Sequence, residues 1–179
     1  MPASLPRWVI DNGHSRVGFS VRHLMIANVR GEFRAFTGEL AFDPSDLSSG
    51  GVTVSIEAAS IDTRHEKRDS DLRGPLFFDA EKYPQLKFAS RSAQRSGDGW
   101  EVRGDLTIRD QTHEVVLNVE APTPEVKTPF GELRIGVAAS TKIKRSQWGL
   151  SWNKTLETGG VLIGDDIKIE LELELSHAK

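Results

Sequence analysis

Two places in the chain combine a hydroxyl group with an imidazole, the pair that a hydrolase uses as nucleophile and base. They are His14 with Ser15, and Ser20 with His23. Adjacent residues on a strand point to opposite faces, and no nucleophile-elbow motif is present. The chain also lacks cysteine, which excludes a thiol nucleophile. We therefore predict no catalytic residues and a protein that is not an enzyme; a hydrolase is the least favoured alternative.

Metal-binding residues are equally sparse. His65 and Asp69 are four residues apart, so they would share one face of a helix. Two ligands without a third usually form a solvated surface, and thiolate sites are excluded by the absence of cysteine. The sequence therefore predicts no metal site and no catalytic cofactor.

The length and the charge of the chain limit the size of the fold and the kind of partner it can bind. The chain has 179 residues, a formal net charge of −3 and a pI near 6.0. This length suits a single domain, residues 1–179, with one substantial core. The 23 basic residues are interspersed with 26 acidic ones, so we predict no nucleic-acid partner.

The residues at the N-terminus and the lengths of the apolar stretches indicate where in the cell the protein would be found. Residues 1–15 contain no basic region followed by an apolar run, so they do not form a signal peptide. We expect a cytoplasmic protein, or a periplasmic one if a leader has been removed. No apolar stretch approaches the length of a spanning helix, and charged strand faces would place charge in lipid, so no stable membrane insertion is expected.

Apolar residues recur at every second position over most of the chain, the period of a half-buried strand. A bulge near residues 34–35 is expected within the second strand, and Gly97-Asp98-Gly99 indicates a hairpin. Ser48–Gly51 is expected to be a spacer. The predicted strands cover residues 17–23, 30–42, 52–58, 86–90, 100–108, 115–121, 133–143 and 167–175. Eight short-turn strands favour an antiparallel sheet that closes on itself as a barrel.

One stretch interrupts this pattern and predicts a helical insert over about residues 63–83. Thr63 and Glu66 have the spacing of a capping box, which would begin a helix that continues through Leu72. Gly74-Pro75 would end it, and Asp79 could cap a single further turn. The apolar run Leu76-Phe77-Phe78 must cover something apolar. It would be either a plug over the end of the core or a lid over a ligand cavity.

An eight-stranded barrel is just wide enough to be filled by side chains or to hold one small ligand. Small inward residues such as Gly38, Ala58 and Gly104 lie beside large ones such as Phe19 and Trp100. This mixture is compatible with a solid tapered core and with a pore, and the sequence pattern does not choose between them.

Several ordered motifs identify a family. They are His14-Ser15 with Phe19–Leu24, Gly31-Glu32-Phe33 with Phe36-Thr37-Gly38, Arg68–Arg73, Phe77-Phe78-Asp79 with Tyr83-Pro84, Gly104–Ile108 and Gly164–Ile169. From Trp8 to Leu175 the chain resembles the YceI-like family of polyisoprenoid-binding proteins. The resemblance implies an all-β fold, an extended lipocalin-like eight-stranded antiparallel β-barrel with a short helical insert. It departs from the family at Asp71-Leu72, where members have His-Leu, and at residues 24–27, which replace a turn containing glycine.

The resemblance also implies a function, the binding of a long-chain polyisoprenoid such as a prenyl quinone or prenyl pyrophosphate for storage, sequestration or transport. The residues expected to line the pore are Phe19, Val21, Phe36, Leu40, Phe42, Ile56, Phe77, Phe78, Phe88, Trp100, Trp148 and Trp152. The polar head group would contact His23, Arg68 and Arg73, because guanidinium binds phosphate in a bidentate manner and histidine suits either head group. Alternatively, these three tie the insert to the barrel through the carboxylates of Asp69, Asp71 and Asp79.

Two alternatives concern partners. A filled barrel would have no cavity and would act through a partner protein, for example in a stress response. Exposed strand edges and the apolar insert could also pair between two chains, so a homodimer is compatible with the sequence.

Overall fold

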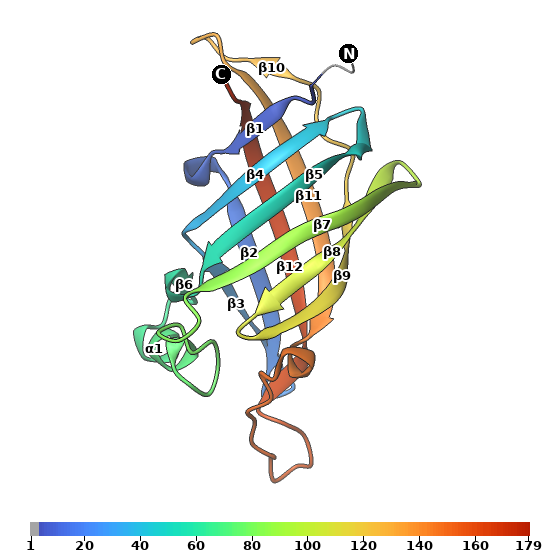
Figure 1. Cartoon of the computed structure of the whole chain (residues 1–179). Helices are drawn as coiled ribbons and strands as arrows, with labels where there is room; N and C mark the ends of the chain where they lie inside the picture. The colour runs from blue at the N-terminus through green and yellow to red at the C-terminus, as the bar shows by residue number, and fades with distance from the viewer. Residues whose placement is uncertain (1–3) are drawn as a thin grey trace.

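A computed structural model describes residues 4–179 of the chain (Figure 1). The strands are β1 (Arg7–Ile10), β2 (Arg16–His23), β3 (Ala27–Phe33), β4 (Phe36–Asp43), β5 (Asp46–Glu57), β6 (Ile61–Asp62), β7 (Gln85–Ser96), β8 (Gly99–Ile108), β9 (Gln111–Val119), β10 (Val126–Lys127), β11 (Leu133–Lys144) and β12 (Ile163–His177). The helices are α1 (Glu66–Arg73) and the 3-10 turns η1 (Asn12–His14), η2 (Ala58–Ser60) and η3 (Arg145–Trp148).

The sheet closes because β12 pairs with β11 on one side and with both β1 and β2 on the other. β1 and β2 therefore share one position in the barrel wall. β4 and β3 share the next, and β5 and β6 the one after. Together with β7, β8, β9, β11 and β12 these make the eight positions of a closed antiparallel barrel, which confirms the predicted fold.

The strand predicted over residues 30–42 is interrupted at residues 34–35, where the bulge was expected. The chain forms two strands, because β3 pairs with β2 and β6 while β4 pairs with β1 and β5. The backbone turns at Arg34 and Ala35, where the Arg34 N–H donates to Ser60 O (3.2 Å) and Ala35 O accepts from Glu57 N (2.9 Å). Phe33 and Phe36 are both buried in the core although three positions apart, so one extra residue shifts the alternation here, as a bulge does. The expected spacer Ser48–Gly51, by contrast, belongs to a strand, β5.

The predicted capping box at Thr63 is also wrong. Helix α1 begins after His65, whose Nδ1 accepts a hydrogen bond from the Arg68 N–H (3.1 Å). Thr63 instead donates from both its N–H and its Oγ1 to Asp69 Oδ1 (2.9 and 2.5 Å), and both side chains are buried. A buried carboxylate needs such donors, so Thr63 fixes the helix to the barrel instead of starting it. The predicted single turn after Asp79 is present, since Asp79 O accepts from the Tyr83 N–H (2.8 Å).

The barrel has one closed and one open end. The closed end, where β1 and β10 lie in Figure 1, is filled by Trp8, Leu40, Phe42, Ile135 and Leu175, which we call the plug. The Trp8 indole stacks on Phe42 at 5.9 Å and its Nε1 donates to Phe42 O (3.0 Å). Helix α1 and the segment after β11 lie at the other end. Within residues 4–179, no helix is long and apolar enough to span a membrane.

The plug should contribute strongly to stability. Replacing Trp8 by alanine removes a fully buried indole and should lower the free energy of unfolding by about 3–5 kcal/mol. Val9→Ala is the matched control, because Val9 follows Trp8 but is 52% exposed, and its effect should be within about 0.5 kcal/mol. Urea denaturation measures both. Equal losses in the two variants would contradict this role of the plug.

Candidate functional site

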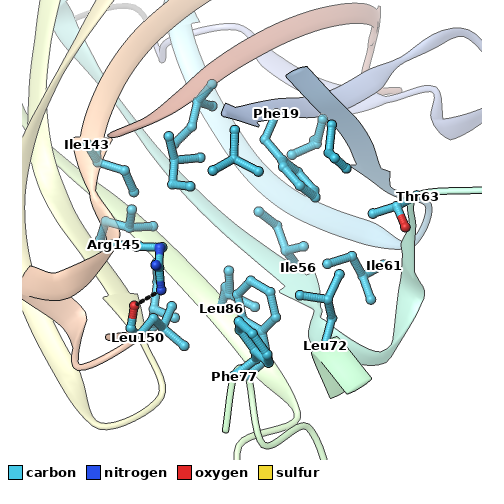
Figure 2. A pocket seen from close by; sticks show the side chains of 18 of the residues that line it. Phe19, Ile56, Ile61, Thr63, Leu72, Phe77, Leu86, Ile143, Arg145 and Leu150 are labelled. Carbon is cyan, nitrogen blue, oxygen red and sulfur yellow. Dashed lines mark hydrogen bonds between the residues drawn. The ribbon is translucent and has the colours of Figure 1, made fainter. Parts of the chain in front are cut away.

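A cavity of about 730 Å³ occupies the interior of the barrel toward its open end (Figure 2). Its size lies within the range of roughly 300–1,000 Å³ that small-molecule sites occupy. A filled barrel would have had no such cavity, so that alternative is not what the structure shows. The wall is formed mainly by inward-facing aliphatic and aromatic side chains, among them Ile10, Val17, Val54, Leu86, Ile143, Ile167, Ile169 and Leu171.

The structure places most, but not all, of the predicted pore residues on this wall. Those that line the cavity are Phe19, Val21, Phe36, Ile56, Phe77, Phe78, Phe88 and Trp152. Leu40 and Phe42 belong to the plug and line a second, smaller cavity of about 120 Å³.

Trp100 and Trp148 line neither cavity, contrary to expectation. Trp148 is 1% exposed, its Nε1 donates to Leu106 O (2.9 Å), and its ring meets the His113 ring edge-on at 5.2 Å. The Arg95 guanidinium lies over the Trp100 ring at 4.8 Å. Buried indoles need a partner for their N–H, and an apolar cavity offers none, so the Trp148 ring is held by the carbonyl in the wall.

A constriction separates the two cavities. Five residues line both of them: Val54, Phe88, Leu117, Leu171 and Leu173. The Phe88 ring lies against Gly104, where an added Cβ would be 2.5 Å from Phe88 Cζ. Only glycine leaves room for the ring at this point. Phe88 is therefore the largest side chain at the boundary between the main cavity and the plug.

The aromatic run of the insert covers the main cavity. Phe78 meets Phe33 of β3 edge-on at 5.6 Å, and Phe77 packs on Trp152 at 5.7 Å. Both phenylalanines line the cavity and are only half-buried. The sequence left open whether the aromatic run is a plug over the core or a lid over a cavity, and the structure shows a lid. Through the contact of Phe77 with Trp152, the lid also connects the insert to the segment that follows η3.

The three predicted head-group residues have different positions. His23, at the end of β2, and Arg68, in α1, both line the cavity. Arg68 also donates from Nε to Thr63 Oγ1 and from Nη2 to Thr63 O (both 2.7 Å). Arg73 does not line the cavity, because its guanidinium donates to Ala59 O (2.9 Å) and Ile61 O (3.2 Å). The arginines thus tie the insert to the barrel through carbonyl and hydroxyl oxygens, and not through the expected carboxylates.

Arg145 is a cavity residue that the sequence reasoning missed. Its side chain is 6% exposed and lines the cavity, as Figure 2 shows. It donates to four backbone oxygens: Leu150 O (2.6 Å), Gly164 O (2.9 Å), Trp152 O (3.0 Å) and Ile163 O (3.3 Å). Burial lowers the pKa of the guanidinium from its ordinary value, but arginine remains charged at neutral pH. Among residues 4–179 no carboxylate forms an ion pair with it.

The alternation of β11 contained the signal for Arg145. Ile135, Val137 and Ile143 lie on the inward face, and continuing the same period by one step places residue 145 inward as well. A cation on an inward position at the end of a strand is uncommon and marks a candidate site.

The residues considered as a nucleophile–base pair or as metal ligands form other hydrogen bonds and ion pairs. Ser15 Oγ bonds the backbone of Glu174, and the His14 ring bonds Asp11 (2.9 Å), so these neighbours do not form a nucleophile–base pair. No hydrogen bond joins Ser20 to His23 within the described residues. Asp11, His14 and Glu174 have the spacing of a metal site, but Arg134 Nη1 lies 2.6 Å from Asp11 and 2.7 Å from Glu174. The Arg134 and His14 hydrogen bonds lower the pKa of Asp11 to about 2, as in a structural ion-pair cluster.

Comparisons with known proteins agree with this architecture. The YceI-like domain matches residues 8–175 of the chain. A UPF0312 protein of Staphylococcus epidermidis is 35% identical over 172 residues, covering 96% of this chain and 98% of that protein. The crystal structure of BcnA from Burkholderia cenocepacia has a TM-score of 0.80 at 23% identity, over 92% of this chain and 98% of its own. A polyisoprenoid-binding domain from Saccharophagus degradans has a TM-score of 0.68 at 16% identity, over 96% and 98% of the two chains. The chain belongs to the YceI-like family.

Proposed function

We propose that this protein binds the chain of a polyisoprenoid, such as a prenyl quinone or prenyl pyrophosphate, in the main cavity, and stores or carries it without catalysis. The observation that carries the proposal is the 730 Å³ cavity with an almost wholly apolar wall inside a closed barrel. A structural neighbour in Saccharophagus degradans described as polyisoprenoid-binding supports the ligand class. No catalytic cofactor is part of the proposal.

The wall suits a branched hydrocarbon. Each five-carbon isoprene unit would gain roughly 4 kcal/mol by leaving water, before the cost of ordering the chain. The head group would remain near the open end, where His23 and Arg68 lie on the cavity wall and Arg145 adds a buried charge. His23 and Arg68 would supply donors for a phosphate or for a quinone oxygen, and Arg145 would act mainly through its charge. Arg73 is not part of the proposed site.

The decisive experiment is native mass spectrometry of protein purified without detergent, followed by organic extraction of any bound molecule. We expect a mass excess that extraction identifies as an isoprenoid, either as purified or after incubation with prenyl quinones and prenyl pyrophosphates. A bare polypeptide mass under both conditions would overturn the proposal.

Filling the cavity should abolish binding. Ile169 lines the cavity from β12, so Ile169→Trp should remove most of the bound isoprenoid in the same measurement. Lys168→Trp is the matched control, because Lys168 adjoins Ile169 on the outer face of the strand and is exposed. It should retain the ligand. Loss in both variants would show that the tryptophan disturbs the strand and does not act by occupying the cavity.

Phe88 should limit the length of the bound chain. Phe88→Ala removes the ring at the constriction and should join the 730 Å³ and 120 Å³ cavities. We expect the variant to prefer a longer prenyl chain than the parent protein when both compete for a series of prenyl quinones of increasing length. An unchanged length preference, measured by extraction and mass spectrometry, would contradict the assignment of Phe88 as the end of the main cavity.

Arg145 should organise the open end. Replacing it by methionine leaves four backbone carbonyls without their donor and should lower the free energy of unfolding by about 2–4 kcal/mol. Lys144→Met is the control, since Lys144 is exposed and its ion pair with Asp166 lies on the surface, where such pairs contribute little. Urea denaturation compares the two. If Arg145→Met were no more destabilised than the control, Arg145 would not hold the segment.

A further inference from the structure

We propose that the open end of the barrel docks on a lipid bilayer through an apolar rim around the cavity mouth. Five exposed side chains form this rim: Leu24, Met25, Ile26, Leu76 and Val161. They come from three segments that border the mouth, namely the β2–β3 hairpin, the insert and the chain before β12. The inference rests on the proposed function, because a bilayer is where a polyisoprenoid would be collected or released.

The hairpin tip is continuous with the mouth. The Leu24 N–H donates to Leu162 O (2.9 Å), and Met25 packs over Gly160, where an added Cβ would be 2.9 Å from Met25 Cγ. Leu162, His23 and Leu76 all line the cavity. A ligand that enters or leaves by this end therefore passes beside the exposed rim.

The backbone of the hairpin tip has left-handed φ values at two large apolar residues. Leu24 and Met25 have φ values of 52° and 65°, and the Ile26 N–H donates to His23 O (3.1 Å), so they occupy the two central positions of a tight hairpin turn. Positive φ at both positions is the pattern of the type I′ turn, which favours Asn-Gly. Large apolar side chains are strained there, and they also face water. Such strain in residues whose side chains remain exposed to water is expected at a functional site.

The occupant that fits is a bilayer instead of a charged partner. Charges of both signs lie at this end, among them Lys67, Asp71, Lys154 and Glu157. They provide no single-sign field, so attraction would come from the apolar side chains entering the interfacial region of the lipid. Docking of this kind depends little on salt.

The test is flotation of the full chain with vesicles of phosphatidylcholine, with and without phosphatidylglycerol, in the absence of any isoprenoid. We expect the protein to float with both vesicles. The double variant Leu24→Asn with Met25→Gly should float about fivefold less, while its unfolding temperature rises by about 2–6 °C because Asn-Gly relieves the strain. If the turn had only a structural role, a more stable variant would float as well as the parent protein. A variant that is more stable but floats less therefore supports a role of the turn in docking.

Two single substitutions, one at the rim and one at the closed end, separate the rim from exposed apolar side chains in general. Ile26→Ser changes an exposed rim side chain outside the strained positions, and it should also reduce flotation. Phe130→Ser removes a side chain that is 92% exposed at the closed end, and it should leave flotation unchanged. Equal flotation of the double variant and the parent, or equal loss with Phe130→Ser, would overturn the proposal. So would a homodimer that buries the rim and floats with neither vesicle. Native mass spectrometry of the loaded protein tests isoprenoid binding separately, so the two proposals fail independently.

Discussion

The pairing of β11 with β12 closes the sheet, and the rest of the structure depends on that closure. The two strands match over eleven residue pairs, from Arg134 opposite Ser176 to Lys144 opposite Asp166. A closed antiparallel sheet satisfies the backbone hydrogen bonds of its strands within the wall, whatever fills the interior. The interior side chains are therefore free to be small, and the barrel can enclose a space without losing its wall.

Side chains that line a cavity give up packing contacts on one side, which costs stability relative to a filled core. A solid core would be the more stable arrangement for the same wall, so the cavity is a feature maintained for binding. The plug around Trp8 shows that this chain can fill a barrel end where no space is needed.

The alternation of apolar residues correctly predicts which strand residues face the interior of the barrel. It does not predict the structure where the strands are interrupted or end. Alternation places residues such as Phe19, Ile56 and Phe88 inward, and the structure has them on the cavity wall. It does not reveal where a wall position is divided between two strands, as it is between β3 and β4 and between β1 and β2. Periodicity gives no information about Trp148, which lies in η3 and whose Nε1 donates to Leu106 O instead of facing the cavity.

The long-range polar contacts could not be predicted either. Thr63 has the local spacing of a helix cap. In the structure, however, its N–H and its hydroxyl both donate to the buried Asp69 carboxylate, so Thr63 does not cap the helix. Whether a threonine caps a helix or satisfies a buried acid depends on the depth of the acid, which is a property of the tertiary structure. Arg145 is the instructive case, since its position was readable by extending β11 but its four carbonyl partners come from a segment without periodicity.

In the proposed binding mode, the affinity for a prenyl lipid and the selectivity among prenyl lipids depend on different parts of the cavity. An apolar wall attracts every hydrocarbon of suitable width, and a few isoprene units at roughly 4 kcal/mol each would already approach the practical affinity ceiling of about −18 to −21 kcal/mol. The wall therefore cannot discriminate among prenyl lipids by total burial. If the proposed ligand is bound, discrimination has to come from the two ends of the cavity: Phe88 and the plug at one end, and His23, Arg68 and Arg145 on the wall near the other. A buried guanidinium that already donates to four carbonyls has few donors left, so it acts on a head group mainly through its charge. On this reasoning a phosphate would gain more from the open end than an uncharged quinone ring.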